Sequence, residues 1–511
     1  MSEEKHFRGM TPENLALTDT SQTPIPFDNT YARLSDAFYE RVSPTKVPAP
    51  ELLRVNDALA SQLRIDPEFL KSPAGLAFLS GNAIAPGSEP IAQAYAGHQF
   101  GNFVPQLGDG RAILLGEVLD IAGRRYDLQL KGSGRTRFSR RGDGRAALGP
   151  VIREYIVSEA MAALGIPTTR SLAAVLTGEN VMRESILPGG VLTRVASSHL
   201  RVGTFQYFAA RGDIENLRQL ADYAIARHYP SAESADNRYV ALYDSVVAAL
   251  AGLVARWMLV GFIHGVLNTD NTSIAGETID YGPCAFLDAY HPDKVFSLID
   301  QYGRYAFANQ PAIIKWNLAR FAEAMLPLMA ENAEKAIEAA NTSLARFNEH
   351  FSTAYLAGLR RKLGLSLAME GDLELASDLL ARMAENGADF TLTFRALSEV
   401  AVDSKCVADA RALFANPAAF DEWASRWQQR LSLEEGSAEL RRASMRSVNP
   451  MFIPRNHRIE AAIEDANAGR FDKFNELVEV LDRPYDDQPQ FAHYAKPPAP
   501  EEEVRQTFCG T

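Results

Sequence analysis

The most informative segment is His264-Gly-Val-Leu-Asn-Thr-Asp-Asn271, together with Asp280-Tyr-Gly282, which follows nine residues later. Asn271 and Asp280 carry amide and carboxylate oxygens, the ligands that Mg²⁺ prefers alongside waters and phosphate oxygens. A metal ion held by these two side chains could neutralise the charge that develops during phosphoryl or nucleotidyl transfer. The stretch therefore predicts a magnesium site that holds a triphosphate.

The spacing of these residues matches the catalytic centre of protein kinases. Kinases have a His-x-Asp loop, an Asn five residues after that Asp, and then a metal-binding Asp-x-Gly. His264, Asn271 and Asp280 fit this order, but Val266 stands where a kinase has its proton acceptor, and valine cannot take a proton. Either the chain is catalytically inactive, or Asp270 serves as the base.

A β-hairpin is predicted between the two metal-site residues. Segments 272–274 and 277–279 are strand-like, and Ala275-Gly276 between them favours a turn. The simpler interpretation of Thr269–Asn271 alone is a polar turn, because Asp and Asn hydrogen-bond locally in turns. The joint match of the surrounding residues favours the metal site.

A lysine and a glutamate upstream suit the same kind of site. Lys131 ends a predicted strand, and Glu154 lies near the start of a helix predicted over 151–164, which Gly165 and Pro167 would end. Kinases pair a strand lysine with a helix glutamate to hold phosphates. The alternative is an ordinary surface ion pair, worth about 0–1 kcal/mol.

Glycine-rich and basic segments could bind phosphates. Gly108, Gly110 and Arg111 precede a predicted strand, although Gly-Asp-Gly is also a common turn. The segment 131–145 has six basic residues, one acid and four glycines, a composition that predicts a loop around a polyphosphate rather than core. It lacks the order of a P-loop. A solvated basic loop, or a site for another anion, stays an alternative.

Arg194 and Arg201, seven residues apart, could add further phosphate contacts. Each arginine taken alone would be interpreted as a surface residue. A role of the two arginines in phosphate binding is favoured only because the same chain carries the other candidate residues.

The remaining pattern predicts an α+β fold with a β-rich first part and a helical second part. Residues 177–180 are typical of a hairpin turn, and Pro327 is expected to end a helix. Residues 1–35 are predicted to form an extended lead-in. The predicted strands are 112–118, 126–130, 172–176, 181–183 and 191–195, and the predicted later helices are 312–326 and 333–363.

This order of elements predicts a bilobal arrangement with a small β-rich lobe and a large helical lobe, and ligand clefts often form between two such lobes. The predicted division is an N-terminal extension at 1–35, a small lobe with nucleotide-binding loops at 36–210, a large lobe with the catalytic loop and metal site at 211–310, a helical extension at 311–482 and a tail at 483–511.

Composition narrows the choice of partners and compartment. The 511 residues carry a formal net charge of −12, which argues against a nucleic-acid-coating role. Cys284, Cys406 and Cys509 lie too far apart for a metal or redox motif, so a reducing compartment, the cytoplasm, is expected. The N-terminus lacks the apolar core of a signal peptide.

No membrane partner is expected either. The apolar run 245–255 has 11 residues before Arg256, too few to span a bilayer, and predicts a buried helix. We expect a monomer.

Several long blocks of the chain resemble the selenoprotein O (YdiU) family, from about residue 30 to the C-terminus. They are Tyr95-Ala-Gly-His-Gln-Phe-Gly101 with Gln106–Arg111, Leu130–Arg145, His264–Asn271 with Asp280–Gly282, and Asn449-Pro-Met-Phe-Ile-Pro-Arg-Asn-His457.

This resemblance implies a kinase-like fold that binds ATP in a reversed orientation and transfers AMP to Ser, Thr or Tyr hydroxyls of proteins, releasing pyrophosphate. UMP transfer with Mn²⁺ is also ascribed to bacterial members. Carried over by position, Asp270 would accept the proton, Asn271 and Asp280 would bind Mg²⁺, and Glu154 would pair with Lys131. The nucleotide would be lined by Gly108, Gly110, Arg111, Lys131, Asp143, Gly144, Arg194, Arg201 and Asp280.

The chain departs from part of the family at its C-terminus. Eukaryotic members carry selenocysteine close to a cysteine there, whereas this chain has Cys509 with no second cysteine nearby. A free tail thiol is the favoured interpretation, and pairing with Cys284 or Cys406 stays open. Two other functions also stay open: an ordinary kinase that transfers the γ-phosphate, and an inactive nucleotide-binding scaffold.

Overall fold

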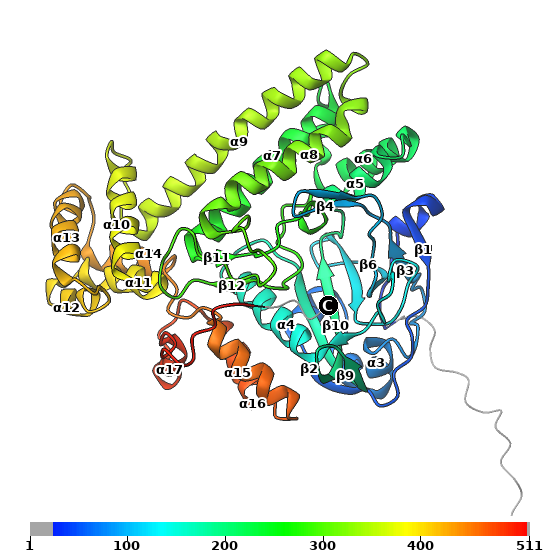
Figure 1. Cartoon of the computed structure of the whole chain (residues 1–511), viewed down its shortest axis with the longest axis horizontal. Helices are drawn as coiled ribbons and strands as arrows, with labels where there is room; N and C mark the ends of the chain where they lie inside the picture. The colour runs from blue at the N-terminus through cyan, green and yellow to red at the C-terminus, as the bar shows by residue number, and fades with distance from the viewer. Residues whose placement is uncertain (1–23, 508–511) are drawn as a thin grey trace, which may run out of the picture.

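The computed structural model describes residues 24–507 and has a mixed α/β architecture (Figure 1). An antiparallel sheet occupies the first part of the chain, and helices dominate from residue 202 onward. The strands of the main sheet are β1 Tyr39–Arg41, β2 Glu51–Val55, β3 Ile91–Gln93, β6 Ala112–Leu119, β7 Arg125–Lys131, β8 Ala146–Ala147, β9 Arg170–Met182 and β10 Ile186–Ala196. Two small pairs are β4 Gly97–Gln99 with β5 Asn102–Val104, and β11 Phe262–Ile263 with β12 Ala285–Phe286.

The strands of the main sheet run in the order β1-β3-β6-β7-β10-β9-β2, and β8 pairs with β10. Because side chains alternate along a strand, β7 sends Leu128 and Leu130 to one face and Gln129 and Lys131 to the other. The first face packs in a hydrophobic cluster with residues of α1 to α3. The second face packs against α4 and opens toward the helical part, so Lys131 lies where the two parts meet.

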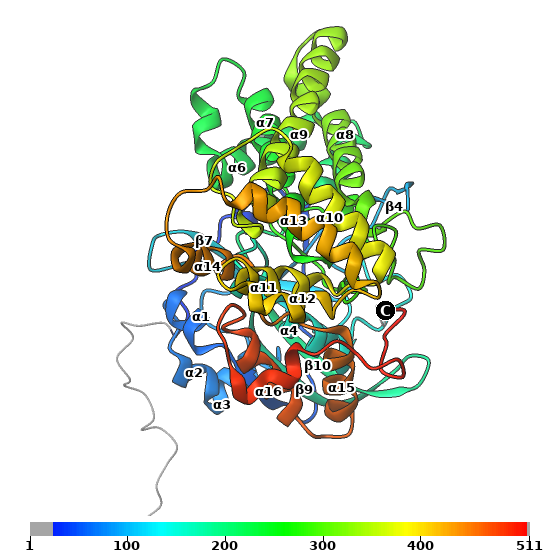
Figure 2. The same cartoon turned by 90° about the vertical axis from the view of Figure 1, so that its left-hand side faces the viewer.

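The helices form two groups (Figures 1 and 2). The long helices α7, α8 and α9 pack together, and α10 to α14 gather at the side of the molecule away from the sheet. The bounds are α1 Asp57–Gln62, α2 Pro67–Lys71, α3 Pro73–Leu79, α4 Leu148–Ala163, α5 Val202–Ala209, α6 Ile214–His228, α7 Arg238–Val260, α8 Gln310–Met329, α9 Ala333–Lys362, α10 Asp372–Asn386, α11 Phe390–Val400, α12 Val407–Arg411, α13 Pro417–Leu431, α14 Ala438–Arg446, α15 Asn456–Asn467, α16 Asp472–Leu481 and α17 Ala492–Ala495.

The helices predicted over 151–164 and 333–363 are confirmed as α4 and α9, and the apolar run 245–255 lies in α7 as a buried helix. Among the described residues, α7 is the one helix long and apolar enough to span a membrane, but 61% of its most apolar window is buried in the fold. It contacts α8 and α9 along its length, which makes it a core helix.

The hairpin predicted around residues 177–180 is wrong. β9 runs without a break from Arg170 to Met182 and turns into β10 only after that. The pairing of the two strands is irregular between Pro188 and Gly190, opposite Gly178, which has a φ of 73°. A Cβ at Gly178 would lie 2.6 Å from Cβ of Ala49, so this glycine serves a bulge packed against a neighbouring segment.

Other boundaries also differ from expectation. α8 continues two residues beyond Pro327, and Leu328 and Met329 are buried in the core. The lead-in predicted at 1–35 is packed where it is described, since Ile25 and Tyr31 are buried. The tail lies against the body, because Thr507 Oγ1 donates to the Pro283 carbonyl. Cys509 lies outside the described residues, so its predicted free thiol stays a prediction.

Lys362, in the last turn of α9, is a buried cation without a carboxylate partner among residues 24–507. It is 2% exposed, and its Nζ lies 4.4 Å from the centre of the Phe394 ring. Burial lowers the pKa of Lys362 from 10.5 to about 7. Between these values the unfolded chain holds a proton that the folded chain has released, so the free energy of unfolding rises with pH across this window.

We predict that Lys362→Met raises the melting temperature at pH 7 and removes this rise, because it deletes a costly buried charge worth about 1–3 kcal/mol. Melting curves from pH 7 to 10 measure it. Lys335→Met, at an exposed position of the same helix, is the control and should change stability by less than about 0.5 kcal/mol. Equal behaviour of the two variants would contradict the prediction.

Candidate functional site

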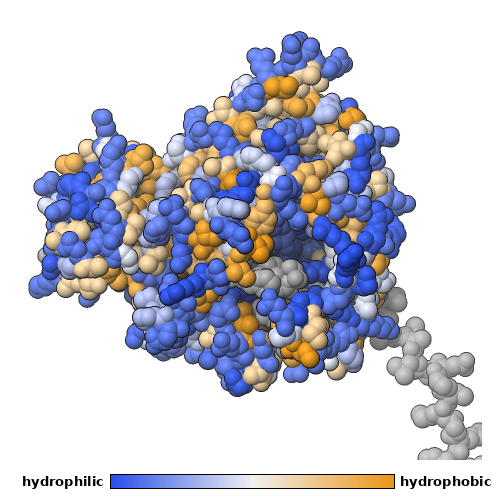
Figure 3. All heavy atoms as spheres, viewed as in Figure 1, coloured by the Kyte–Doolittle hydropathy of each residue, from blue (hydrophilic) through white to orange (hydrophobic). Residues whose placement is uncertain are grey.

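A cleft of about 720 Å³ lies where the sheet meets the helical part, and Figure 3 shows a hollow near the centre of this face. It brings together almost every site residue predicted from the sequence. Its lining includes Gly108, Gly110, Arg111, Lys131, Asp143, Gly144, Arg194, Arg201, Asp270, Asn271 and Asp280. Glu154 lies directly behind the lining, in contact with Lys131 and Arg194.

The carboxylate of Asp280 is the centre of the cleft. Arg194 Nη2 lies 2.6 Å from its Oδ1, and Arg201 Nη1 lies 2.6 Å from its Oδ2. Lys131 Nζ lies 3.4 Å from Oδ1. The side chain is 21% exposed, so it reaches the cleft while three cations surround it. Segments 80 to 150 residues apart in the chain thus converge on one group.

Glu154 holds two of these cations from behind. Its carboxylate contacts Lys131 Nζ, and it accepts from Arg194 Nε at 2.8 Å. α4 carries Glu154, β7 carries Lys131 and β10 carries Arg194, so the packing of α4 on the sheet positions all three. Lys131 pairs with Glu154 as predicted. Arg194 and Arg201 are 1% and 3% exposed, so neither is a surface arginine.

The charges of this cluster keep both acids ionised. Burial by itself would raise the pKa of Asp280, but Arg194, Arg201 and Lys131 outweigh it and hold that pKa well below its usual value. The pKa of Glu154 is lowered by Arg194 and Lys131 against the same effect of burial. Asp280 also has a φ of 64°, in the left-handed region, which non-glycine residues rarely adopt and which often marks functional sites.

Asp270 and Asn271 lie in a 3₁₀ turn, Thr269–Asn271, at the edge of the cleft. Asn271 Nδ2 donates to the Val266 carbonyl at 3.0 Å, and Arg201 Nη1 donates to the Asp270 carbonyl at 2.6 Å. Asp270 is 7% exposed, and burial raises its pKa to about 6, although a hydrogen bond from Gln99 opposes the rise.

The β4–β5 pair supplies contacts to this turn that the sequence analysis missed. The His98 amide donates to Thr269 Oγ1 at 2.7 Å, and Gln99 Nε2 donates to Asp270 Oδ2 at 3.1 Å. Thr269 Oγ1 in turn donates to Gln206 Oε1 of α5 at 2.7 Å. The block 95–101 stood out in the sequence by its resemblance to a family, but neither its composition nor its spacing indicated these contacts.

The hairpin predicted after Asn271 is wrong, although the turn at Ala275-Gly276 is present. The two predicted strands on either side of this turn do not pair with each other, because each pairs with a different segment. Ser273 bridges to Arg201, and Thr278 bridges to Thr168 just after α4. The segment after the Thr269–Asn271 turn therefore contacts the segment that carries Arg201 on one side and the residues after α4 on the other.

The glycine and basic loops form one wall of the cleft but pack more closely than predicted. Phe138, in the middle of the basic segment 131–145, is 5% exposed in the core. A Cβ at Gly108 would lie 2.4 Å from the Phe138 ring, and one at Gly110 would lie 2.9 Å from its carbonyl oxygen. These glycines are therefore required by the packing of the loop against Phe138, whether or not they also allow phosphates to approach the backbone. Asp143 pairs with Arg183 at 2.9 Å.

The residues fit a magnesium ion by the chemistry of their oxygens. The amide NH₂ of Asn271 donates a hydrogen bond to the Val266 carbonyl. Asn271 and Asp280 both line the cleft. One carboxylate and one amide, completed by water and phosphate oxygens, is a usual donor set for Mg²⁺. No cluster of three His, Cys, Asp or Glu side chains that could hold a metal by itself occurs within residues 24–507.

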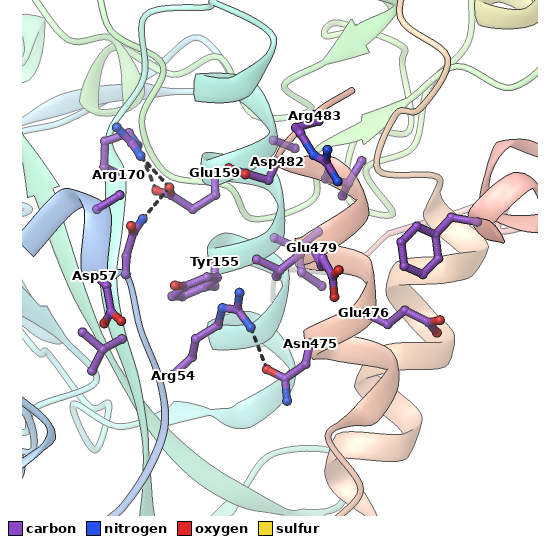
Figure 4. A pocket seen from close by; sticks show the side chains of 18 of the residues that line it. Arg54, Asp57, Tyr155, Glu159, Arg170, Asn475, Glu476, Glu479, Asp482 and Arg483 are labelled. Atoms are coloured by element: carbon purple, nitrogen blue, oxygen red, sulfur yellow. Dashed lines mark hydrogen bonds and ion pairs between the residues drawn. The ribbon is translucent and has the colours of Figure 1, made fainter. Parts of the chain in front are cut away.

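A second hollow, of about 840 Å³, lies between β2, α4 and α16 (Figure 4). Two of its three arginines are engaged within it: Arg170 pairs with Glu159, and Arg54 donates to Asn475. The third, Arg483, is exposed and lies 4.0 Å from Asp486. Its remaining charges are mostly acidic side chains of α16, such as Glu479. Although this hollow is larger, it offers little to a polyphosphate, so the cleft at Asp280 is the candidate site.

Comparison with known proteins identifies the family of the chain. The family model described as Protein adenylyltransferase SelO matches residues 22–482. The chain is 79% identical over 495 residues to a protein named Protein nucleotidyltransferase YdiU from Nitrobacter hamburgensis, covering 97% of this chain and 98% of that protein. Proteins of the same name from Nitrobacter winogradskyi and Bradyrhizobium diazoefficiens are 78% and 62% identical, each covering at least 95% of both chains.

The chain belongs to the SelO family of protein adenylyltransferases. It is accordingly an enzyme, and its relatives are named for nucleotidyl transfer rather than phosphotransfer. The resemblance noted in the sequence is confirmed.

We predict that Arg194→Met destabilises the protein by roughly 3–5 kcal/mol, because it leaves Glu154 and Asp280 without their shared buried partner. Denaturant unfolding measures the change. Arg33→Met is the control, because the Arg33 side chain is 68% exposed in its pair with Asp28. This variant should change the free energy of unfolding by less than about 1 kcal/mol. Similar stability of both variants would show that the cluster does not support the fold.

Proposed function

We propose that this chain transfers AMP from ATP to Ser, Thr or Tyr hydroxyls of proteins and releases pyrophosphate. The observation that carries the proposal is the convergence of Lys131, Arg194 and Arg201 on Asp280 in the cleft that also contains Asp270 and Asn271. Three cations in one partly buried cleft suit a triphosphate. The names of the relatives favour nucleotidyl over phosphoryl transfer.

In this proposal the molecule works as a kinase-like pair of lobes with the nucleotide between them. Lys131 and Arg194, supported by Glu154, and Arg201 bind the buried end of the triphosphate. Asn271 and Asp280 hold Mg²⁺, or Mn²⁺, which when bound neutralises charge on the phosphates. Asp280 would exchange part of its present contacts with the cations for the metal. The rest of the nucleotide lies along the wall formed by Gly108, Gly110, Arg111, Asp143 and Gly144.

Asp270 is the base of the proposed reaction. The hydroxyl oxygen of the acceptor attacks the α-phosphorus, a new O–P bond forms, and the bond from that phosphorus to the β-phosphate bridge breaks. Pyrophosphate leaves, and the hydroxyl proton passes to Asp270. A carboxyl whose pKa lies near 6 is largely ionised at neutral pH and still basic enough to accept this proton. UTP in place of ATP would give UMP transfer by the same steps.

Incubation with α-labelled and γ-labelled ATP tests the proposal. We expect label to reach protein from α-labelled ATP only. Label from the γ position would indicate ordinary phosphotransfer, and nucleotide binding without transfer of either label would indicate an inactive scaffold.

Two variants assign the roles. Asp270→Asn should lower transfer by about 10²- to 10⁴-fold with ATP binding retained, because only the proton acceptor is lost. Asp280→Ala should abolish transfer, because a metal ligand is lost. Asp421→Ala, which removes a carboxylate of a surface ion pair, is the control and should transfer normally. Full activity of Asp270→Asn would exclude it as the base.

A further inference from the structure

The two oxygens of the Asp270 carboxylate have different surroundings. Oδ2 accepts the hydrogen bond from Gln99 Nε2 at 3.1 Å. Oδ1 is buried and has no hydrogen-bond partner in the described part of the chain. A buried carboxylate oxygen without a partner is costly, and such groups in native structures call for an explanation. Asp270 lines the cleft, and its Oδ1 lies against the backbone of Gly97, where an added Cβ would be 2.6 Å away.

We propose that Gln99 is a positioning residue, which holds the Asp270 carboxylate through Oδ2 in the orientation that receives the proton of the acceptor hydroxyl. This inference rests on the proposed function and assigns a role in it to the β4–β5 hairpin. Gln99 itself transfers no proton and belongs to the first part of the chain, 171 residues before Asp270.

The backbone on both sides of Asp270 supports this role. A Cβ at Gly97 would lie 2.6 Å from Asp270 Oδ1, and a Cβ at Gly203 would lie 3.4 Å from the Asp270 Cα. The Ala96 amide donates to the Gly203 carbonyl at 2.9 Å, which joins the hairpin to the start of α5. Glycine at position 97 therefore allows the hairpin backbone to approach the Asp270 carboxylate, while Gly203 is in ordinary contact with the Asp270 backbone.

The hairpin is itself anchored to the catalytic turn. The His98 amide donates to Thr269 Oγ1, and the Phe100 amide donates to Asn268 Oδ1 at 3.1 Å. His98 Nδ1 also shares a hydrogen bond with Gln206 Nε2. Because the residues on both sides of Gln99 are hydrogen-bonded to this region, the backbone of Gln99 is held in place relative to Asp270. Misplacement of a reacting group by about 1 Å can cost on the order of 10²-fold in rate.

The test is Gln99→Leu, which keeps side-chain volume but removes the donor. The rate of transfer from α-labelled ATP is measured against ATP concentration, with the chain itself as acceptor. We expect kcat to fall tenfold or more while KM for ATP stays within twofold, because the phosphate-binding cations are untouched. Asn102→Leu is the matched control: it faces Gln99 across the hairpin, is exposed and should keep the full rate.

Gly97→Ala is a second variant that crowds Oδ1 from the backbone, and it should also lower kcat. A crystal structure of Gln99→Leu gives a readout independent of activity, in which the Asp270 carboxylate should be turned away from its present orientation. Unchanged kcat, or an unchanged carboxylate orientation, would overturn the positioning role. Absence of any transfer by the unaltered protein would instead overturn the proposed function, and this inference with it.

Discussion

The partly buried carboxylate of Asp280 must be neutralised, and the cations that do so join the sheet to the helical part. A buried acid is tolerated only when cations and hydrogen bonds replace the water it has lost. Here the cations come from β7, from β10 and from the residue before α5, while Asp280 itself follows the catalytic turn. The sheet, the helix α4 and the helical part must therefore be assembled together for any of these charges to be stable.

The same arrangement leaves the site ready for a charged ligand. Without a ligand the three cations are balanced by Asp280 and Glu154, so the cluster has a net charge of about +1 and can accept phosphate oxygens. The Thr269–Asn271 turn is held by the β4–β5 hairpin on one side and by Arg201 on the other. Because Arg201 also contacts Asp280, it links this turn to the charged cluster of the same cleft.

Much of the cleft could be predicted from the sequence, because the spacing of Asn271 and Asp280 and the lysine–glutamate pair match the kinase pattern. Lys131, Glu154 and Asp280 were found in this way, and the structure brings them into contact. The arms after Asn271 were mispredicted because their backbone partners lie in distant segments, which no local pattern shows. Gly178 was read as a turn when it serves a bulge, since a glycine signals both. Gln99 was missed because its role depends on a contact across 171 residues.

A crystal structure of the chain with a non-hydrolysable ATP analogue and Mg²⁺ would show whether the triphosphate and the metal bind at Asp280. We expect the triphosphate between Lys131 and Asp280, the metal on Asn271 and Asp280, and the α-phosphorus on the side of Asp270. A triphosphate bound elsewhere, such as in the hollow beside α16, or a metal held without Asp280, would contradict this expectation.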